Sequence, residues 1–371
     1  MTSAPDRHVW RVFGTFPGDG FQKAQSKMFA FSPPCAQTAL EIGENDMNWK
    51  TGALCAFGLA LGLVACQPDT QQPAAPAEGN DAVDVSTQTA QNLLTLSATG
   101  MMFEGPNAIN SGWTTVRFDN QSGMVHFAVL ERLPEGITIE DQLREVTPLF
   151  QAGFDQLAAG DTDAAMAAFG GLPAWFGDMV FIGGPGLVSG GLSGEATVYL
   201  EPGRYSVECY VKTAGVFHTM NAGDGSRGML HELIVSDSDG GAMEPTATVT
   251  VDISGDGIAI ADGAFAAGSN MVRVNYLSQQ VHGNFVGHDV HIARLEDDTD
   301  MNGLASWMDW RNPGGLETPS PVTFVGGLNE MPAGSHGYFP VELEPGRYAL
   351  VSEIDDPASK GFLVEFVIPN P

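Results

Sequence analysis

The stretch FIGGPGLVSGGLSGEATVYLEPGRY, residues 181–205, is matched without a gap by FVGGLNEMPAGSHGYFPVELEPGRY, residues 324–348. The two segments begin at Phe181 and Phe324 and are therefore 143 positions apart. Solenoid repeats recur at much shorter intervals, roughly 20 to 50 residues. A period this long indicates a duplicated domain.

Two further pairs of segments flank this match in the same order. They are HFAVLERL from His126 with HDVHIARL from His288, and RGMLHELIV from Arg227 with KGFLVEFVI from Lys360. Three anchors in one order predict two homologous domains, at residues 92–240 and 245–370.

Each copy is expected to be all-β. Segments such as WTTVRFDN and RYSVECYV alternate or run apolar between clusters of Gly, Pro and Asn, as strands do. The repeated Glu-Pro-Gly at 201–203 and 344–346 predicts tight turns, since Pro presets φ and Gly accepts positive φ. Tandem Greek-key β-sandwiches are the economical architecture.

One insert, residues 138–170 of the first copy, breaks the strand pattern. Thr138 and Asp141 are spaced like a capping box, Pro148 suits a helix start, and Gly160 suits a helix stop. We expect two or three short helices that cap one end of the first sandwich.

Composition narrows the possible functions. The 371 residues include 45 Asp and Glu against 16 Lys and Arg, a formal charge of −29, and 43% are hydrophobic. This apolar content excludes a wholly disordered chain, and the negative charge argues against nucleic-acid binding. No nucleophile elbow, phosphate loop or HExxH pattern is convincing, so we expect a protein that is not an enzyme.

The N-terminal quarter is interpreted as a targeting region. The apolar run 51–65 follows Lys50 and is shorter than the ~20 residues of a membrane-spanning helix, which is typical of a signal peptide. Its end, Leu-Val-Ala-Cys at 63–66, resembles the lipobox of bacterial lipoproteins, and the resemblance implies lipidation of Cys66. Because a signal must be N-terminal, we predict translation from Met47, a signal peptide at 47–65, and residues 1–46 as a mis-called upstream extension.

Residues 66–91 are rich in Gln, Pro, Ala and Asp, and predict a disordered tether. Gln67 after the lipidated cysteine resembles the sorting signal for the outer membrane. The resemblance implies a lipoprotein of the bacterial cell envelope that faces the periplasm or the cell surface and is held by its lipid anchor.

Cys209 is the most informative residue for function. After lipidation of Cys66 it has no partner in an oxidising compartment. Two His, one Cys and a weak axial Met form a ligand set typical of copper. The first copy supplies such a set, with His126 on an early strand and Cys209, His218 and Met229 around the last strands.

This order of ligands in a β-sandwich resembles the cupredoxins of the plastocyanin and azurin type. The resemblance implies a metal site at His126, Cys209, His218 and Met229 that binds one copper ion for one-electron transfer. Copper handling remains open, as do Met220 and Met124 as axial ligands, because the loop after Cys209 is longer than in the family.

The second copy is predicted to be degenerate. It has Ser352 in place of Cys209, Phe362 in place of Met229, and no His between them. It keeps His288 at the position of His126, which favours a structural role for this histidine in both copies.

The sequence offers two alternatives to the copper site, a zinc cluster and a metal-free binding module. His282, His288 and His291 are discounted as a zinc cluster, because positions 288 and 291 of a strand face opposite sides. The alternative function is a metal-free binding module for a protein or glycan. An electron carrier with this charge would have a basic redox partner.

Overall fold

The computed structural model describes residues 92–220 and 227–370. The predicted upstream extension 1–46, signal peptide 47–65, tether 66–91 and lipidation site Cys66 lie outside the described residues. Within the described ranges, the helices are too short or too polar to cross a membrane.

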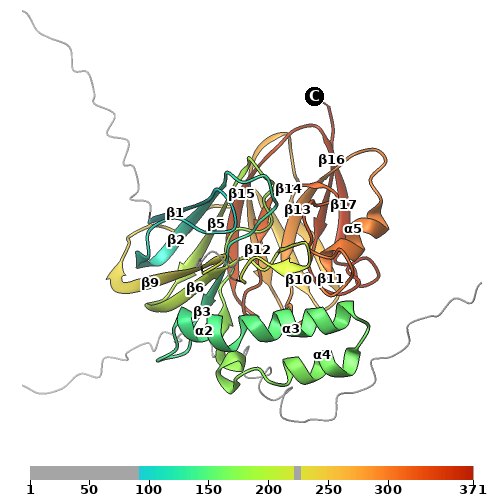
Figure 1. The fold of residues 1–371 in the computed structure, drawn as a ribbon. Helices are drawn as coiled ribbons and strands as arrows, with labels where there is room; N and C mark the ends of the chain where they lie inside the picture. Colours follow the sequence, from blue (N-terminus) through green and yellow to red (C-terminus); the bar gives the residue numbers. More distant parts are fainter. Residues whose placement is uncertain (1–91, 221–226, 371) are drawn as a thin grey trace, which may run out of the picture. The chain divides into compact units, whose positions relative to one another are not determined.

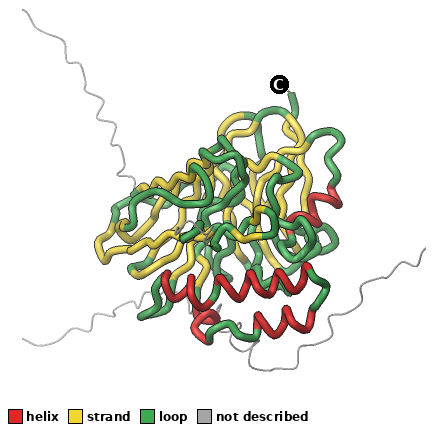
Figure 2. The backbone as a smooth tube through the Cα atoms, viewed as in Figure 1, coloured by secondary structure: helices red, strands yellow, loops and turns green. Residues whose placement is uncertain are grey.

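Strands are the main regular structure of the described chain and far outnumber the helices, which confirms the all-β prediction (Figures 1 and 2). The first half contains β1 (Leu93–Ala98), β2 (Ala108–Asn120), β3 (Val129–Arg132), β4 (Val180–Phe181), β5 (Ser193–Leu200), β6 (Gly203–Glu208), β7 (Lys212–Thr213), β8 (Val216–Phe217) and β9 (Leu230–Asp239). The second half contains β10 (Val249–Ser254), β11 (Gly257–Gly263), β12 (Gly268–Tyr276), β13 (Val290–Leu295), β14 (Thr323–Leu328), β15 (His336–Leu343), β16 (Gly346–Val351) and β17 (Leu363–Ile368).

Strand β2 belongs to both layers of the first sandwich. From Gly112 onward it pairs with β5, and its later residues also pair with β1, whereas residues 108–111 pair with β9. The register shifts between Asn110 and Ser111, and Gly112 has a φ of +100° that a residue with a side chain rarely adopts. This bend carries β2 into the second layer, which continues through β9, β6, β3 and β4.

The second half repeats this two-layer arrangement. One layer has the order β11-β10-β12-β15, and the other has the order β14-β13-β16-β17. Strand β15 also pairs antiparallel with β5, through Tyr338 and Thr197. One layer is therefore continuous across the two halves. The domain limits 92–240 and 245–370 stay predictions.

The repeated sequence produces a repeated corner. Tyr205 donates its hydroxyl to the carbonyl of Glu201 at 2.8 Å, and Tyr348 donates to Glu344 at 3.0 Å. Both tyrosines are buried, and in each case the bond spans the Glu-Pro-Gly turn. These tyrosine corners fix the strand entering each second layer.

The predicted helical insert is confirmed. It consists of α2 (Ile139–Glu145), α3 (Thr147–Ala158) and α4 (Thr162–Phe169), and the short 3₁₀ helix η1 (Ala174–Asp178) follows. Thr138 and Asp141 form the expected capping box, Pro148 lies in the first turn of α3, and Gly160 follows the end of α3 with positive φ. Helices α3 and α4 lie side by side across one end of the strands (Figure 1). A separate helix, α5 (Met301–Met308), lies in the second half.

Candidate metal centre

Backbone hydrogen bonds place Cys209 in the core of the first half. It is the first residue after β6, and its amide donates to the carbonyl of Met229 at 3.1 Å. Among the described residues it is a free cysteine, and its side chain has no exposed surface. The pairing of β6 with β9 therefore places the Cys209 thiol beside β9, the last strand of the first half.

The two predicted histidine ligands arrive from different segments. His126 lies between β2 and β3, where it exchanges two backbone hydrogen bonds with Val188, at 3.1 and 2.7 Å. His218 follows β8, and its amide donates to Val211 at 2.8 Å. Both imidazoles are buried, with 0% and 1% of their surface exposed.

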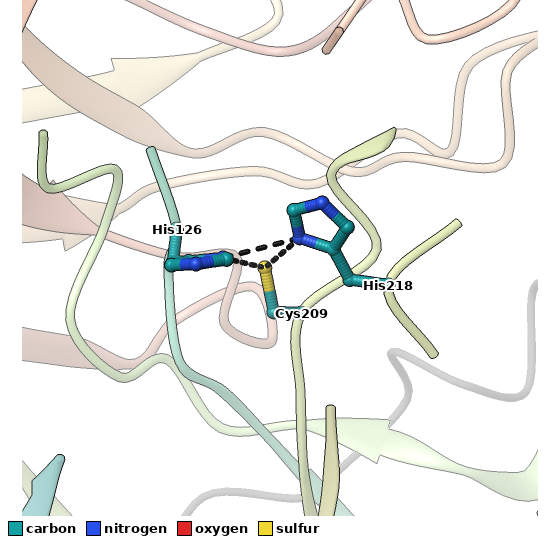
Figure 3. A group of neighbouring side chains, drawn as sticks. All are labelled: His126, Cys209 and His218. Carbon is teal, nitrogen blue, oxygen red and sulfur yellow. Dashed lines mark hydrogen bonds between the residues drawn. The ribbon is translucent and has the colours of Figure 1, made fainter. Parts of the chain in front are cut away.

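The three side chains converge on one point (Figure 3). The Cys209 sulfur lies 3.5 Å from Nδ1 of His126 and 3.9 Å from Nδ1 of His218, and the two Nδ1 atoms lie 3.1 Å apart. A point equidistant from three atoms with these separations is about 2 Å from each, which is close to metal–nitrogen and metal–sulfur bond lengths. The group therefore fits a metal ion bound in the plane of three donors.

Burial sets the charge of these groups. It lowers the pKa of His126 to about 3, with a further contribution from His218, and lowers the pKa of His218 to about 4. Burial also raises the pKa of the Cys209 thiol to about 12. At neutral pH both imidazoles are thus uncharged, with lone pairs available to a metal, and the thiol loses its proton when the metal binds.

A second set of contacts orients His218. Its Nε2 lies 2.8 Å from the Thr213 hydroxyl, which lies 2.8 Å from the hydroxyl of Thr318 in the second half. Donation from Nε2–H to Thr213 leaves the Nδ1 lone pair directed at the centre, an arrangement common for metal-binding histidines. Nε2 of His126, by contrast, is buried and has no hydrogen-bond partner within residues 92–220 and 227–370.

Backbone hydrogen bonds hold Met229 next to the trio of His126, Cys209 and His218. Its amide donates to the carbonyl of His218 at 2.7 Å, its carbonyl accepts from Cys209, and its side chain is fully buried. Gly228 makes this approach possible, because a Cβ there would lie 2.5–2.7 Å from the carbonyl oxygens of residues 218–220.

The two alternative methionines lie differently. The Met124 sulfur is 3.5 Å from the Thr213 hydroxyl, beside the Nε2 edge of His218 rather than its Nδ1 edge. Met220 is half-buried and packs against the core. The axial ligand stays a prediction, with Met229, Met220 and Met124 as the candidates.

The second half fills the equivalent positions with other contacts. The amide of Ser352 donates to the carbonyl of Phe362 at 3.1 Å, as Cys209 does to Met229. The His288 ring packs on the Phe362 ring at 4.7 Å between centroids, and the Ser352 hydroxyl donates to Asp289. These contacts match the two halves residue by residue and place an aromatic ring where Met229 lies in the first half.

The structure also contains a buried group that sequence analysis missed. Nε2 of His291 lies 2.8 Å from Asp289 and 3.1 Å from Glu353. A local signal existed, since Asp289 and His291 are two positions apart and share one face of a strand. Glu353 comes from a distant segment and gave no such signal.

Hydrogen bonding argues against a metal at this second group. Although burial acts in the opposite direction, Asp289 and then Glu353 raise the pKa of His291 to about 9. The amide of Leu187, however, donates to Nδ1 of His291 at 2.9 Å, which requires a lone pair there. The ring proton therefore lies on Nε2, between the two carboxyl groups, where a metal would otherwise bind.

No protein-family model and no curated protein matches the chain. Among solved structures, the chain is similar to auracyanin A, a "blue" copper protein from Chloroflexus aurantiacus, at 18% identity and a TM-score of 0.22, over 39% of this chain and 98% of that one. It is also similar to a multicopper oxidase, at 12% identity and a TM-score of 0.19, over 74% and 87%. A copper-containing nitrite reductase from Thermus scotoductus SA-01 gives 10% identity and a TM-score of 0.20, over 76% and 68%.

Proposed function

We propose that the protein binds one copper ion in a cupredoxin-like centre of its first half and carries single electrons. The ligands are Nδ1 of His126, Sγ of Cys209 and Nδ1 of His218. The observation that carries this proposal is the convergence of these three atoms at separations of 3.1–3.9 Å.

The chemistry of the donors favours copper over zinc. One thiolate and two imidazoles in a plane, with a thioether alongside, suit copper. Zinc prefers four strong donors in a tetrahedron, and the fourth is usually a side chain or water. Among the described residues, the groups that could bind a metal include no fourth His, Cys, Asp or Glu beside this trio.

Met229 is proposed as the weak axial ligand. In the second half the equivalent residue, Phe362, packs directly on the ring of His288. Because the backbone contacts of the two halves correspond, this neighbour relation supports a position for the Met229 side chain against His126.

Burial favours electron transfer over copper delivery. The three ligand residues are at most 1% exposed, and Thr213 and Thr318 hold His218 from behind. A delivery protein needs a route by which copper leaves quickly, whereas an electron carrier benefits from ligands that stay fixed. When bound, the copper ion would supply the redox chemistry; the chain supplies the fixed donors and excludes water.

The setting of this activity is also a proposal. The lipobox-like segment ending at Cys66 supports attachment to the outer membrane, and the net charge of −29 supports a basic redox partner. A metal-free module that binds a protein or glycan is the alternative.

Copper titration of the purified protein tests the proposal. We expect one copper ion per chain and an intense visible absorption in the oxidised form, both lost in Cys209→Ser. Tight binding of Cu(I) without the visible band would favour copper handling. Absence of binding, or binding unchanged in Cys209→Ser, would favour the metal-free module.

A further inference from the structure

A cavity of about 60 Å³ lies where the helical insert meets both halves of the chain. It is separate from the three metal-binding side chains, although Tyr210 and Thr219 in its wall are sequence neighbours of Cys209 and His218. Its lining combines three carboxylic side chains with a wall of aromatic rings. The carboxylic residues are Glu131, Glu208 and Glu330, and the rings belong to Phe150, Phe176, Phe181, Phe217, Phe285 and Trp310.

Glu131 and Glu208 are hydrogen-bonded to each other, and the other hydrogen-bond partners of the carboxyl groups among the described residues are neutral. Glu131 accepts from Gln142 and from Ser206, each at 2.7 Å, and Gln142 also donates to Glu208 at 2.8 Å. Glu330 accepts from the amide of Gly287.

Within 92–220 and 227–370, the ion pairs of the protein include none of these three glutamates. Glu131 and Glu330 are nevertheless 2% and 7% exposed. Buried carboxyl groups are usually paired with a cation, because an isolated buried charge is costly. Burial raises the pKa of Glu131 and of Glu330, as expected when such a partner is missing.

The aromatic wall is already used by one cation. The ammonium group of Lys212 lies 5.7 Å from the centroid of Phe217 and 3.6 Å from that of Phe154. This ammonium group donates to the carbonyl of Trp310, so it already has a hydrogen-bond partner and is not the cation of the cavity. The negative faces of aromatic rings attract cations, and they do so more strongly where water is excluded.

A side-chain oxygen in the cavity wall also lacks a hydrogen-bond donor among the described residues. Asn284 lines the cavity and is fully buried. Its Nδ2 donates to the carbonyl of Glu353 at 2.7 Å, which fixes the amide, while its Oδ1 has no hydrogen-bond partner in the described part of the chain. A buried acceptor in this state costs free energy, which a ligand with an N–H group would recover.

We propose that this cavity binds a small alkylammonium ion, with its N–H directed at the carboxyl groups and Asn284 and its alkyl part against the aromatic rings. The proposal is independent of copper binding.

Calorimetric titration of the metal-free protein with methylammonium chloride, which is small enough for the cavity, tests the proposal. Saturable binding is expected, with affinity at least tenfold higher than for methanol, which has the same methyl group and no charge. Glu131→Gln is expected to weaken binding at least tenfold, while Glu135→Gln, at an exposed position nearby, leaves it unchanged. If Glu131→Gln fails to fold, as judged by circular dichroism, Glu330→Gln decides in its place.

The same titration on Cys209→Ser separates this proposal from the copper site, since binding of the amine is expected to persist there. Equal affinity for methanol, no saturable heat with methylammonium at millimolar concentration, or binding of Ca²⁺ in preference to the amine would each overturn the assignment.

Discussion

The hydroxyl of Thr318 lies 2.8 Å from the hydroxyl of Thr213, across the boundary between the two halves of the chain. Thr213 is in turn the hydrogen-bond partner of His218. The backbone strengthens this junction, because Lys212 donates to the carbonyl of Leu316 at 2.7 Å and Thr318 donates to that of Lys212 at 2.9 Å. The second half, which has Ser352 and Phe362 in place of Cys209 and Met229, therefore positions a ligand residue of the first half.

Replacing Thr213 tests this positioning role. Thr213→Ala leaves the Nε2–H of His218 without its acceptor and frees the ring to rotate, so copper affinity is expected to fall by about 10- to 100-fold. Competition with a chromophoric Cu(I) chelator measures the change. Thr213→Ser keeps the hydroxyl and serves as the control, and an unchanged affinity in Thr213→Ala would contradict the positioning role.

Equivalent histidines in the two halves provide a matched pair of variants. We expect His126→Gln to abolish the visible absorption of the copper-loaded protein, because it removes a donor, whereas His288→Gln keeps one copper ion per chain. Metal analysis and the visible spectrum of both proteins check this. The opposite result, with His288 required and His126 dispensable, would place the metal in the second half and contradict the assignment.

The tyrosine corners are expected to stabilise both halves. Tyr205→Phe removes the hydrogen bond to the Glu201 carbonyl, and Tyr348→Phe removes the bond to the Glu344 carbonyl together with the one accepted from the Glu344 amide. Each variant is expected to lower the free energy of unfolding by about 1 kcal/mol. Urea denaturation measures the loss. A change in only one of the two variants would show that the repeated sequence does not have a repeated energetic role.

Asp355 makes the stability of the folded protein depend on pH. The hydrogen bond from His282, followed by the one from Lys360, holds the pKa of Asp355 well below its usual value. A lowered pKa in the folded state stabilises the protein above the unfolded value near 4, and the effect is lost as pH falls through the folded value. Asp355→Asn is thus expected to cost about 1 kcal/mol at pH 6, since the group is only partly buried, and to cost progressively less below pH 4. Urea denaturation at several pH values checks this, and a constant difference would contradict it.

Local sequence signals predicted much of this structure. Thr138 with Asp141, Pro148 and Gly160 each have a short-range geometric role, and the structure shows each role as expected. The candidate ligands His126, Cys209 and His218 were identified by chemistry, because few ligand sets combine an unpaired thiol with imidazoles.

Contacts between distant segments could not be predicted in this way. Thr318 stabilises His218 through Thr213, and Asn284 meets the glutamates of the cavity, only because the loops of the second half pack over the first. Pairing of β5 with β15 through Thr197 and Tyr338 is equally invisible, since each strand has an ordinary alternating pattern. Such contacts depend on how the folded sheets and loops pack against one another, and no local pattern in a single sequence indicates them.

X-ray absorption spectroscopy of the copper-loaded protein tests the central claim most directly, because it reports the atoms bonded to the metal. The account predicts one sulfur and two imidazole nitrogens at about 2.0–2.3 Å from copper, with the sulfur lost in Cys209→Ser. A first shell of nitrogen and oxygen alone in the unaltered protein would contradict it.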